Sequence, residues 1–398
     1  MPRGPLPVFS LVLGLVPVLG LGLGLGLPPP ALALDAGVPG EPAAAADAAG
    51  WRAGVLHLHT HSRNGWTLGG RLPAASAYSA TGLEALMGAA EREGLDWIAI
   101  TDHNAIDAWF DPGFKPSGRT IPIGAEEWTT FGGHMGLLGF RAEGPEGAIL
   151  PARVLLPTAD HYRRGIAEAK RRGGVAIIHH PRGRVYDFPD DPFGADAVEV
   201  LRRGSRAEDG IDWWQERLRE GHRLVAVGGS DYHVATGAAR VAAGAFRPIT
   251  LVRAAANERE AILEGLRRGH VQVLRDPKSP RVFLGLDRDG DGRFAEAEAG
   301  DVVRLGPGPG PGPGAGAAPR VQARVVGGAG RTLVAYGPDG EIGRRALARD
   351  DEAVALPLAP PAAGGRTFVR VEVHDGDGRV ETLSNPIHVE VAAGKEWF

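Results

Sequence analysis

The feature that most constrains the fold is a recurring pattern, in which apolar runs begin or end at side chains that can bind metals. Six such runs occur, and each carries histidine, aspartate or glutamate at one end. The runs cover residues 55–59, 97–103, 121–127, 134–140, 175–180 and 225–233. Because (β/α) barrels place their active sites at the carboxyl ends of the strands, the pattern predicts that these polar groups converge on one metal site.

The stretches between these runs predict helices. Helical patterns cover 83–93, 159–172, 210–220 and 257–268, and a glycine follows each of them. The order strand, helix, strand predicts parallel strands joined by crossover helices. The seven strand candidates are 54–58, 96–101, 121–127, 135–140, 175–179, 196–201 and 224–228. We therefore expect an α/β fold, with a closed or nearly closed barrel over residues 53–276.

The sequence pattern changes after residue 277. Helical periodicity ends there, and short segments of alternating apolar and polar residues follow, separated by turn signals. These segments are 281–286, 321–326, 332–336, 353–358, 367–373 and 387–391. They predict a small all-β domain over residues 277–398, with a sandwich-like architecture. Residues 306–314 alternate glycine and proline, a composition typical of a flexible loop.

The N-terminus has the composition of an export signal. Arg3 precedes an apolar run over residues 6–27, and Ala31-Leu32-Ala33 matches a small-x-small cleavage site. Residues 1–33 therefore predict a signal peptide, and residues 34–52 a linker. The expected location is periplasmic or extracellular, with no membrane span after cleavage. The alternative is an uncleaved membrane anchor.

Composition narrows the chemistry further. The chain has no cysteine, which excludes disulfides and thiolate ligands, so a metal must take nitrogen and oxygen donors. The formal net charge is −4, and no block of basic residues occurs, so nothing indicates a nucleic-acid partner.

Spacing within the runs selects the candidate ligands. His57 and His59, like Asp231 and His233, are two residues apart on expected strands and therefore face the same side. Glu126 and Glu127 are adjacent, so only one of them can face an inward site. His179 precedes His180 on the same expected strand and therefore faces the opposite side, so we expect it to pack in the core or to contact a ligand rather than the metal. The remaining histidines, His161, His222, His270, His374 and His388, are expected to be structural or at the surface.

At these residues the chain resembles the PHP (polymerase and histidinol phosphatase) superfamily over roughly residues 53–276. The motifs are His57-Leu-His59-Thr-His61-Ser, Thr101-Asp102-His103-Asn104, Glu127-Trp-Thr-Thr, His134, His180-Pro181 and Gly229-Ser-Asp231-Tyr-His233. The resemblance implies a distorted (β/α)7 barrel that binds two or three divalent ions of zinc, manganese or iron and hydrolyses phosphoesters. The metal ligands it implies are His57, His59, His103, Glu127, His134, His180, Asp231 and His233.

The branch that the chain most resembles is the carbaryl-hydrolase-like metallohydrolases. Gly133-His134 after the Glu127 motif and the late Ser384-Asn385-Pro386-Ile387 are similar to that branch. The chain departs from the family pattern at Asn64, where members often have an aspartate that binds a metal. An asparagine is a weaker ligand, so the departure bears on whether a third ion binds. His61 shares the parity of His57 and His59, and could compensate.

These residues predict a secreted metal-dependent hydrolase, a phosphoesterase, that acts on a small phosphorylated ester through a metal-activated water. Asp231, His103 and Asp102 are the candidates for moving the proton. Arg182, Arg184, Arg202 and Arg203 could bind phosphate or be solvated surface residues. The alternatives are a carboxyl or carbamate esterase on the same metals, and a metal-bearing binding protein with weak turnover.

A second metal motif lies near the start of the β domain. Asp287, Asp289, Asp291 and Glu298 match the spacing of an EF-hand calcium loop. The helix that normally precedes such a loop is replaced here by an expected strand at 281–286. A structural calcium site and a plain acidic turn both remain open for this segment.

Overall fold

The computed structural model describes residues 34, 50–60, 80–144, 147–149, 156–182, 187–203, 208–233, 241–242, 244–306, 319–359 and 361–393. The predicted signal peptide, most of the predicted linker and nearly all of the Gly/Pro loop 306–314 lie outside these residues. Within them, no helix combines the length and the apolar character needed to cross a membrane.

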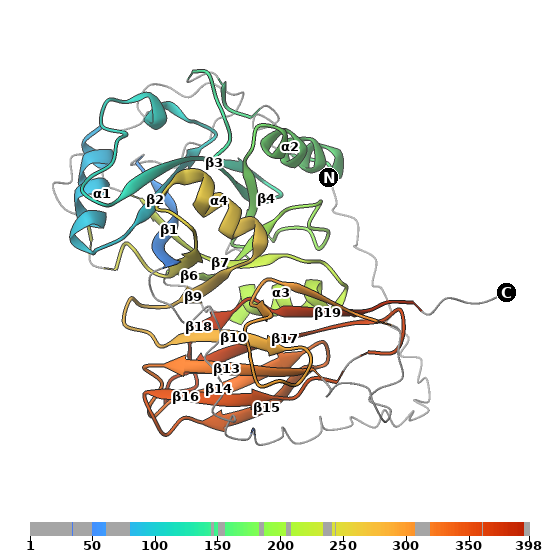
Figure 1. Ribbon diagram of the computed structural model, residues 1–398. Coiled ribbons are helices and arrows are strands. Elements are labelled where there is room, and N and C mark those ends of the chain that lie inside the picture. The colour runs from blue at the N-terminus through green and yellow to red at the C-terminus, as the bar shows by residue number, and fades with distance from the viewer. Residues whose placement is uncertain are drawn as a thin grey trace, which may run out of the picture. The chain divides into compact units, whose positions relative to one another are not determined.

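Seven strands close into the expected barrel (Figure 1). They are β1 (Trp51–His59), β2 (Trp97–His103), β3 (Ile121–Thr130), β4 (Gly133–Leu138), β5 (Val175–His179), β6 (Ala197–Arg202) and β7 (Val225–His233). Each pairs with the next, and β7 pairs with β1 to close the ring. The predicted α/β barrel is thereby confirmed, and its seven strand candidates correspond to these seven strands.

The direction of β4 differs from the parallel arrangement that the sequence predicted. β4 runs antiparallel to both β3 and β5. The reason is the connection, because only Phe131 and Gly132 separate β3 from β4, and a parallel crossover needs a dozen or more residues. The Thr130 hydroxyl stabilises this turn, accepting from the Gly132 N–H at 3.1 Å and donating to the Gly133 carbonyl at 2.6 Å. As a result His134 opens its strand at the same barrel edge where the parallel strands end.

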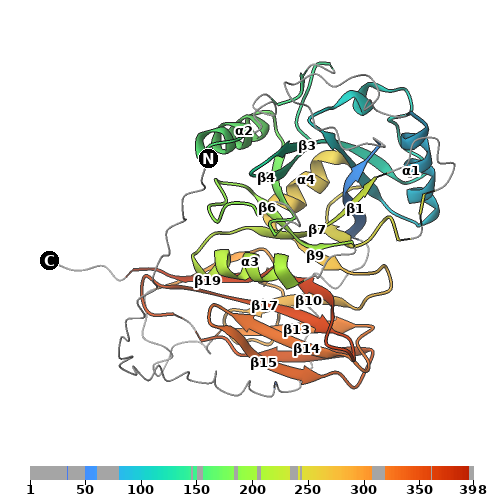
Figure 2. The ribbon, with the colours of Figure 1, turned by 180° about the vertical axis from the view of Figure 1, so that it is seen from behind.

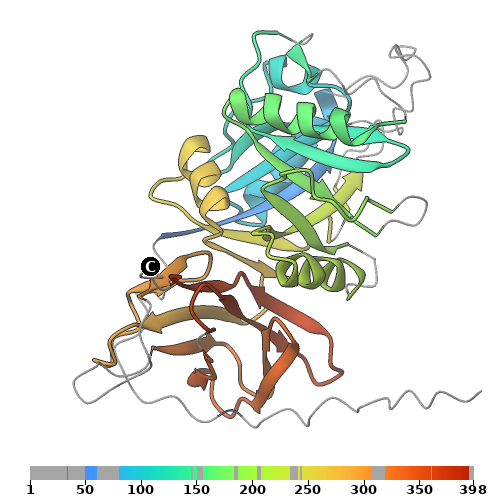
Figure 3. The same ribbon diagram turned by 90° about the vertical axis from the view of Figure 1, so that its right-hand side faces the viewer.

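Four helices pack around the barrel, as Figures 1 and 3 show. They are α1 (Ala80–Arg92), α2 (Ala159–Arg171), α3 (Glu208–Arg219) and α4 (Arg259–Arg268). Their bounds lie within three residues of the predicted ones. In α1, Leu83 and Leu86 are fully buried in one cluster with Ile98 and Ile100 of β2. Helix α4 ends at Gly269, whose φ of 73° is the left-handed conformation that favours glycine.

Two strands that the sequence did not predict flank the barrel, β8 (Ile249–Arg253) and β9 (Val271–Leu274). β8 pairs antiparallel with the first residues of β1, and β9 pairs antiparallel with β18 (Val380–Ser384). Runs of four or five residues are too short to show a period, which explains why the pattern missed them. The division of the chain at residues 276 and 277 stays a prediction, because β9 and β18 pair across it.

The C-terminal part forms two sheets with a shared apolar core. One contains β11 (Ala297–Glu298), β10 (Arg281–Asp287), β13 (Arg320–Val326) and β16 (Asp351–Leu356). The other continues into the barrel sheet through the pairing of β18 with β9, and it contains β12 (Val302–Leu305), β14 (Thr332–Gly337), β15 (Gly340–Ala346), β17 (Arg366–His374), β18 and β19 (Ile387–Val391). Figure 2 shows these strands stacked beside α3. The sandwich-like architecture is as predicted, although β11, β12, β15 and β18 were not.

Candidate metal centre

Glu127 lies at the centre of the cluster, near the end of β3. Its carboxylate is fully buried, and ring nitrogens of six imidazoles lie between 2.7 and 3.5 Å from its oxygens. The six residues are His57, His59, His103, His134, His179 and His180. They come from β1, β2, β4 and the end of β5, so strands far apart in sequence converge as the pattern predicted.

Strand parity separates Glu127 from its neighbour Glu126. Glu126 is also fully buried, but it points to the other face of β3, where its Oε2 accepts the Ile149 N–H at 2.8 Å. Burial raises the pKa of Glu126 to about 8, so this carboxyl is largely neutral at pH 7. Burial also opposes charge on Glu127, but His57, His103 and His134 outweigh it and lower the pKa of Glu127 well below its usual range. Of these two glutamates, Glu127 is therefore the one that presents a charged oxygen to the imidazoles.

Asp231 and His233 complete the cluster from the end of β7. Asp231 Oδ1 lies 3.4 Å from His57 Nε2 and 3.6 Å from His59 Nε2. His233 Nε2 lies 3.2 Å from His103 Nε2. All eight ligands implied by the resemblance are thus brought into one cluster by the structure.

The donor set fits divalent metal ions. Several groups have ligand atoms within 4.8 Å of one another, and three of them consist entirely of predicted ligands: His59, His103 and His233; His57, His59 and Asp231; and His57, Glu127 and His180. His57 Nε2 and both ring nitrogens of His59 are buried and make no hydrogen bond with the described residues, although Glu127 and Asp231 oxygens lie 2.9–3.6 Å from the two Nε2 atoms. Buried polar atoms are normally satisfied, so nitrogens left open toward shared carboxylates are typical of a cation site.

Backbone strain is concentrated at these ligands. Among described non-glycine residues, φ is positive at His57 (63°), Asn104 (50°), His180 (28°), Phe193 (52°) and Asp231 (54°). Three of the five are ligand candidates, and Asn104 follows a fourth, His103. The pairings of β1 with β2 and of β1 with β7 both shift register just before Leu58, next to His57. Such irregularities re-aim side chains, and their cost is tolerated where function requires the resulting geometry.

Two further residues belong to the cluster. Glu199 of β6, which the sequence analysis missed, is buried, and its Oε1 accepts from His57 Nδ1 at 2.8 Å. Its Oε2 accepts the His180 N–H at 2.9 Å. His179, expected in packing, stacks on the His57 ring with 3.7 Å between centroids. The available signal for Glu199 was a lone carboxylate in the apolar strand Ala-Val-Glu-Val-Leu.

We expect Glu199→Gln to weaken metal binding by about 10- to 100-fold, the usual cost of losing a partner that orients a metal-binding histidine. The amide fills the same space but lacks the charge that faces His57 and His179. Competition with a fluorescent chelator measures the change. Glu352→Gln, at a buried carboxylate of the β domain paired with Arg345, is the matched control and should leave metal affinity unchanged.

The geometry assigns the three predicted proton-moving residues to different positions. His103 Nδ1 lies 2.7 Å from Glu127 Oε2 and 2.6 Å from Thr129 Oγ1, within the cluster. Asp231 faces both the cluster and Arg202, whose Nη1 is 3.5 Å from Asp231 Oδ2. Asp102 accepts the backbone N–H and the hydroxyl of Thr60 at 2.7 and 2.5 Å. This contact ties the ends of β1 and β2 together, and it favours a positioning role for Asp102 over the predicted catalytic one.

The remaining candidates divide into three groups. His61, Asn64 and Arg184 lie outside the described residues. The effect of Asn64 on a third ion, and compensation by His61, therefore stay predictions. Arg182 pairs with Asp190 at 3.0 Å, and Arg203 is exposed with its guanidinium over the Tyr232 ring. Arg202 is therefore the candidate arginine whose described contacts reach the cluster.

The proposed calcium loop folds as a turn. Asp287 Oδ1 and Oδ2 accept the backbone N–H groups of Gly290 and Gly292, and Arg320 pairs with Oδ2 at 2.5 Å. Asp289 and Asp291 each accept the N–H two residues later. Glu298, expected as the last ligand, pairs with Arg253. These contacts favour the acidic turn over the calcium site, because an arginine already neutralises Asp287 and Glu298 is engaged elsewhere.

No family model and no curated protein matches the chain. Among solved structures, a two-domain protein of Bacteroides vulgatus, described as containing a predicted PHP-like metal-dependent phosphoesterase, is 12% identical with a TM-score of 0.40. The match covers 85% of this chain and 95% of that one. CopC of Methylosinus trichosporium matches over 25% of this chain and 90% of its own, with 16% identity and a TM-score of 0.16. The functional assignment rests instead on the side chains described above.

Proposed function

We propose that this protein is an exported, PHP-type metal-dependent phosphoesterase that hydrolyses a small phosphorylated molecule. The observation that carries the proposal is the buried Glu127 carboxylate, surrounded by six imidazoles and next to Asp231. Nitrogen and oxygen donors of this kind suit zinc, manganese or iron(II). Bound there, such ions would supply a water of lowered pKa and positive charge opposite the substrate oxygens.

The charges of the predicted metal ligands and of the neighbouring Arg202 indicate what kind of substrate the site would bind. Glu127 and Asp231 are anionic, since their pKa values are held well below the usual range by the surrounding imidazoles in spite of burial. Arg202 pairs with Asp231 and keeps 18% of its side chain exposed, so it is placed to contact a ligand bound beside Asp231. A guanidinium next to metal ions matches a phosphoryl group, which carries more charge than a carboxyl ester. This favours the phosphoesterase over the esterase alternative.

A hydrolysis screen tests the proposal. Full-length protein loaded with Mn²⁺ or Zn²⁺ would be assayed on p-nitrophenyl phosphate, bis-p-nitrophenyl phosphate and p-nitrophenyl acetate. We expect hydrolysis of at least one phosphoester. Activity on the acetate alone would instead identify an esterase, and silence on all three with metal bound would favour a binding protein.

Arg202→Gln tests the assigned phosphoryl contact. We expect KM for the phosphoester, and the inhibition constant of inorganic phosphate, to rise about 10- to 100-fold, because a charge-assisted hydrogen bond contributes about 1.5–3 kcal/mol. Arg203→Gln removes the neighbouring exposed arginine and is the matched control. Equal effects of the two substitutions would contradict a specific contact by Arg202.

The proposed export is tested separately. Expression of the full chain with its own N-terminus should yield protein that begins after residue 33 in the periplasm or medium, as measured by mass spectrometry of the intact chain. An uncleaved chain recovered with membranes would support the anchor instead.

A further inference from the structure

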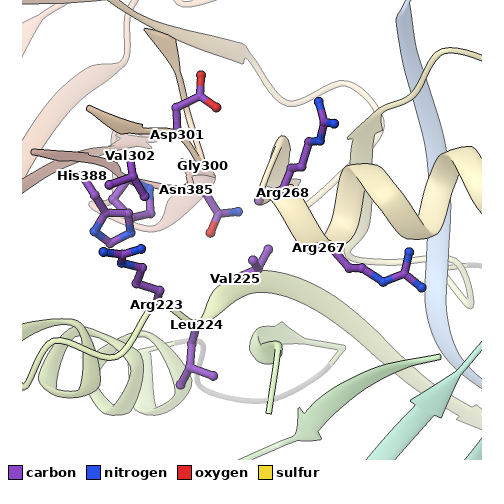
Figure 4. A pocket seen from close by; sticks show the side chains of 12 residues that line it. Arg223, Leu224, Val225, Arg267, Arg268, Gly300, Asp301, Val302, Asn385 and His388 are labelled. Atoms are coloured by element: carbon purple, nitrogen blue, oxygen red, sulfur yellow. The ribbon is translucent and has the colours of Figure 1, made fainter. Parts of the chain in front are cut away.

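A cavity of about 400 Å³ lies outside the metal centre, between the start of β7, the end of α4 and the C-terminal strands. Leu224 and Val225 line it at the start of β7, while Gly300 and Asn385 line it from the C-terminal part of the chain. Figure 4 shows Arg223 and Arg268 on opposite sides of this pocket, with Asn385 between them. Its volume falls within the range of pockets that hold small ligands.

Positive charge exceeds negative charge around this cavity. Arg223 and Arg304 share one carboxylate, Glu390. Arg267 and Arg268 likewise share Glu264, at 3.6 and 2.8 Å. Four guanidiniums thus face these two glutamates and Asp301 of the cavity wall, which leaves a local excess of one positive charge.

The acidic residue in the cavity wall, Asp301, already has partners of its own. Asp301 Oδ1 lies 3.0 Å from His270 Nε2, and its Oδ2 accepts the Glu298 N–H at 2.9 Å. His270, Glu298 and Asp301 have the spacing of a metal site, but Arg253 contacts Glu298. Four nearby guanidiniums would also repel a divalent cation. The charge balance therefore favours an anion over a metal.

Donors remain available to such an anion. Arg268 uses Nε for Glu264, and Arg223 uses Nη2 for Glu390, so each keeps guanidinium nitrogens outside these pairs. The last carbonyls of α4 do not oppose an anion strongly, because Gly269 and His270 donate their N–H groups to Leu266 and Gly265 at 3.1 Å. Burial and the charge of Arg223 lower the pKa of His388 to about 4, so a neutral imidazole lines the same wall.

We propose that this cavity is a second ligand site, which binds a compact oxyanion of the phosphate type through Arg223 and Arg268. The oxyanion is either free phosphate or the terminal group of a small molecule, since the cavity is larger than phosphate alone. This site is independent of the proposed hydrolase activity, because none of its residues contributes to the metal centre.

Arginine modification tests the proposal at the level of single residues. Metal-loaded, full-length protein would be treated with phenylglyoxal, with or without inorganic phosphate, and the modification of each arginine followed by peptide mass spectrometry. We expect phosphate to slow modification of Arg223 and Arg268 at least fivefold. Arg259, an exposed arginine of α4 that pairs with Glu260 and does not line the cavity, is the control. Unchanged rates at Arg223 and Arg268, or equal slowing at Arg259, would overturn the proposal.

A second experiment distinguishes the two sources of the oxyanion and does not depend on modification chemistry. Equilibrium dialysis would compare phosphate with phosphonoacetate, a hydrolysis-resistant probe, on the wild type and on the R223Q/R268Q double variant. We expect the variant to lose one equivalent of bound anion or to bind it at least tenfold more weakly, while hydrolytic activity stays unchanged. Tighter binding of phosphonoacetate assigns a terminal group, and tighter binding of phosphate assigns the free ion. Identical binding by variant and wild type would contradict the site.

Discussion

Replacing Glu127 with glutamine should remove bound metal and lower kcat/KM for the phosphoester by at least about 10³-fold, or about 4 kcal/mol of transition-state stabilisation. The reason is geometric, because this one carboxylate reaches all six imidazoles within 3.5 Å and is held in its charged form. An amide fills the same volume but supplies no charge to balance a divalent ion. Elemental analysis of the purified variant, with steady-state kinetics, measures both effects.

Glu126→Gln is the matched control for this experiment. It changes the adjacent residue of the same strand, equally buried, on the opposite face. Because the Glu126 carboxyl is largely neutral at pH 7, the amide replaces a neutral group, and metal content should remain at the wild-type level. Full metal content and activity in Glu127→Gln would contradict the central role of this carboxylate. Loss of metal in both variants would point to general damage of β3.

Removing the metal from the wild type should abolish hydrolysis and lower the melting temperature. A ligand present at a thousand times its Kd stabilises the folded state by about 4 kcal/mol, equivalent to a shift of roughly 5 °C in Tm for a chain of this length. The stripped site also leaves His57 Nε2 and both ring nitrogens of His59 buried without a hydrogen bond to the described residues. Calorimetry before and after dialysis against a chelator measures the shift. Activity and Tm should both return when Zn²⁺ or Mn²⁺ is added back.

Magnesium added to the stripped protein serves as the control, since it prefers oxygen ligands and should restore much less stability at the same concentration. A chelated protein that keeps its activity and its Tm would show that the cluster is a hydrogen-bonded core rather than a metal centre.

The sequence predicted the barrel and the convergence of its ligands because both depend on local patterns. His57 and His59 could be assigned to one side by spacing alone, although β1 carries a register shift at this level. Parity separated Glu127 from Glu126 without indicating which of them faced inward, and only the resemblance pointed to Glu127. The contact between Glu126 and Ile149 settles that choice, and it depends on a loop remote from the strand.

Other features depend on contacts that no local pattern contains. The antiparallel β4 follows from a two-residue connection, which the expectation of parallel strands had overlooked. Glu199 joins the cluster from β6 through His57, a residue 142 positions away in the chain. The Asp102 carboxylate accepts from Thr60 across two strands, a contact that the residues around His103 do not indicate. In each case the deciding partner is distant in sequence, so only the folded chain identifies it.

The most direct test of the metal centre is X-ray diffraction from crystals of the metal-loaded protein, recorded on both sides of the absorption edge of the bound element. The account predicts anomalous difference peaks within about 2.0–2.3 Å of Glu127 oxygens and of nitrogens of His57 and His180, with further density near Asp231. Crystals of active protein that show no peak there, or a peak only at another group such as His270, Glu298 and Asp301, would contradict it.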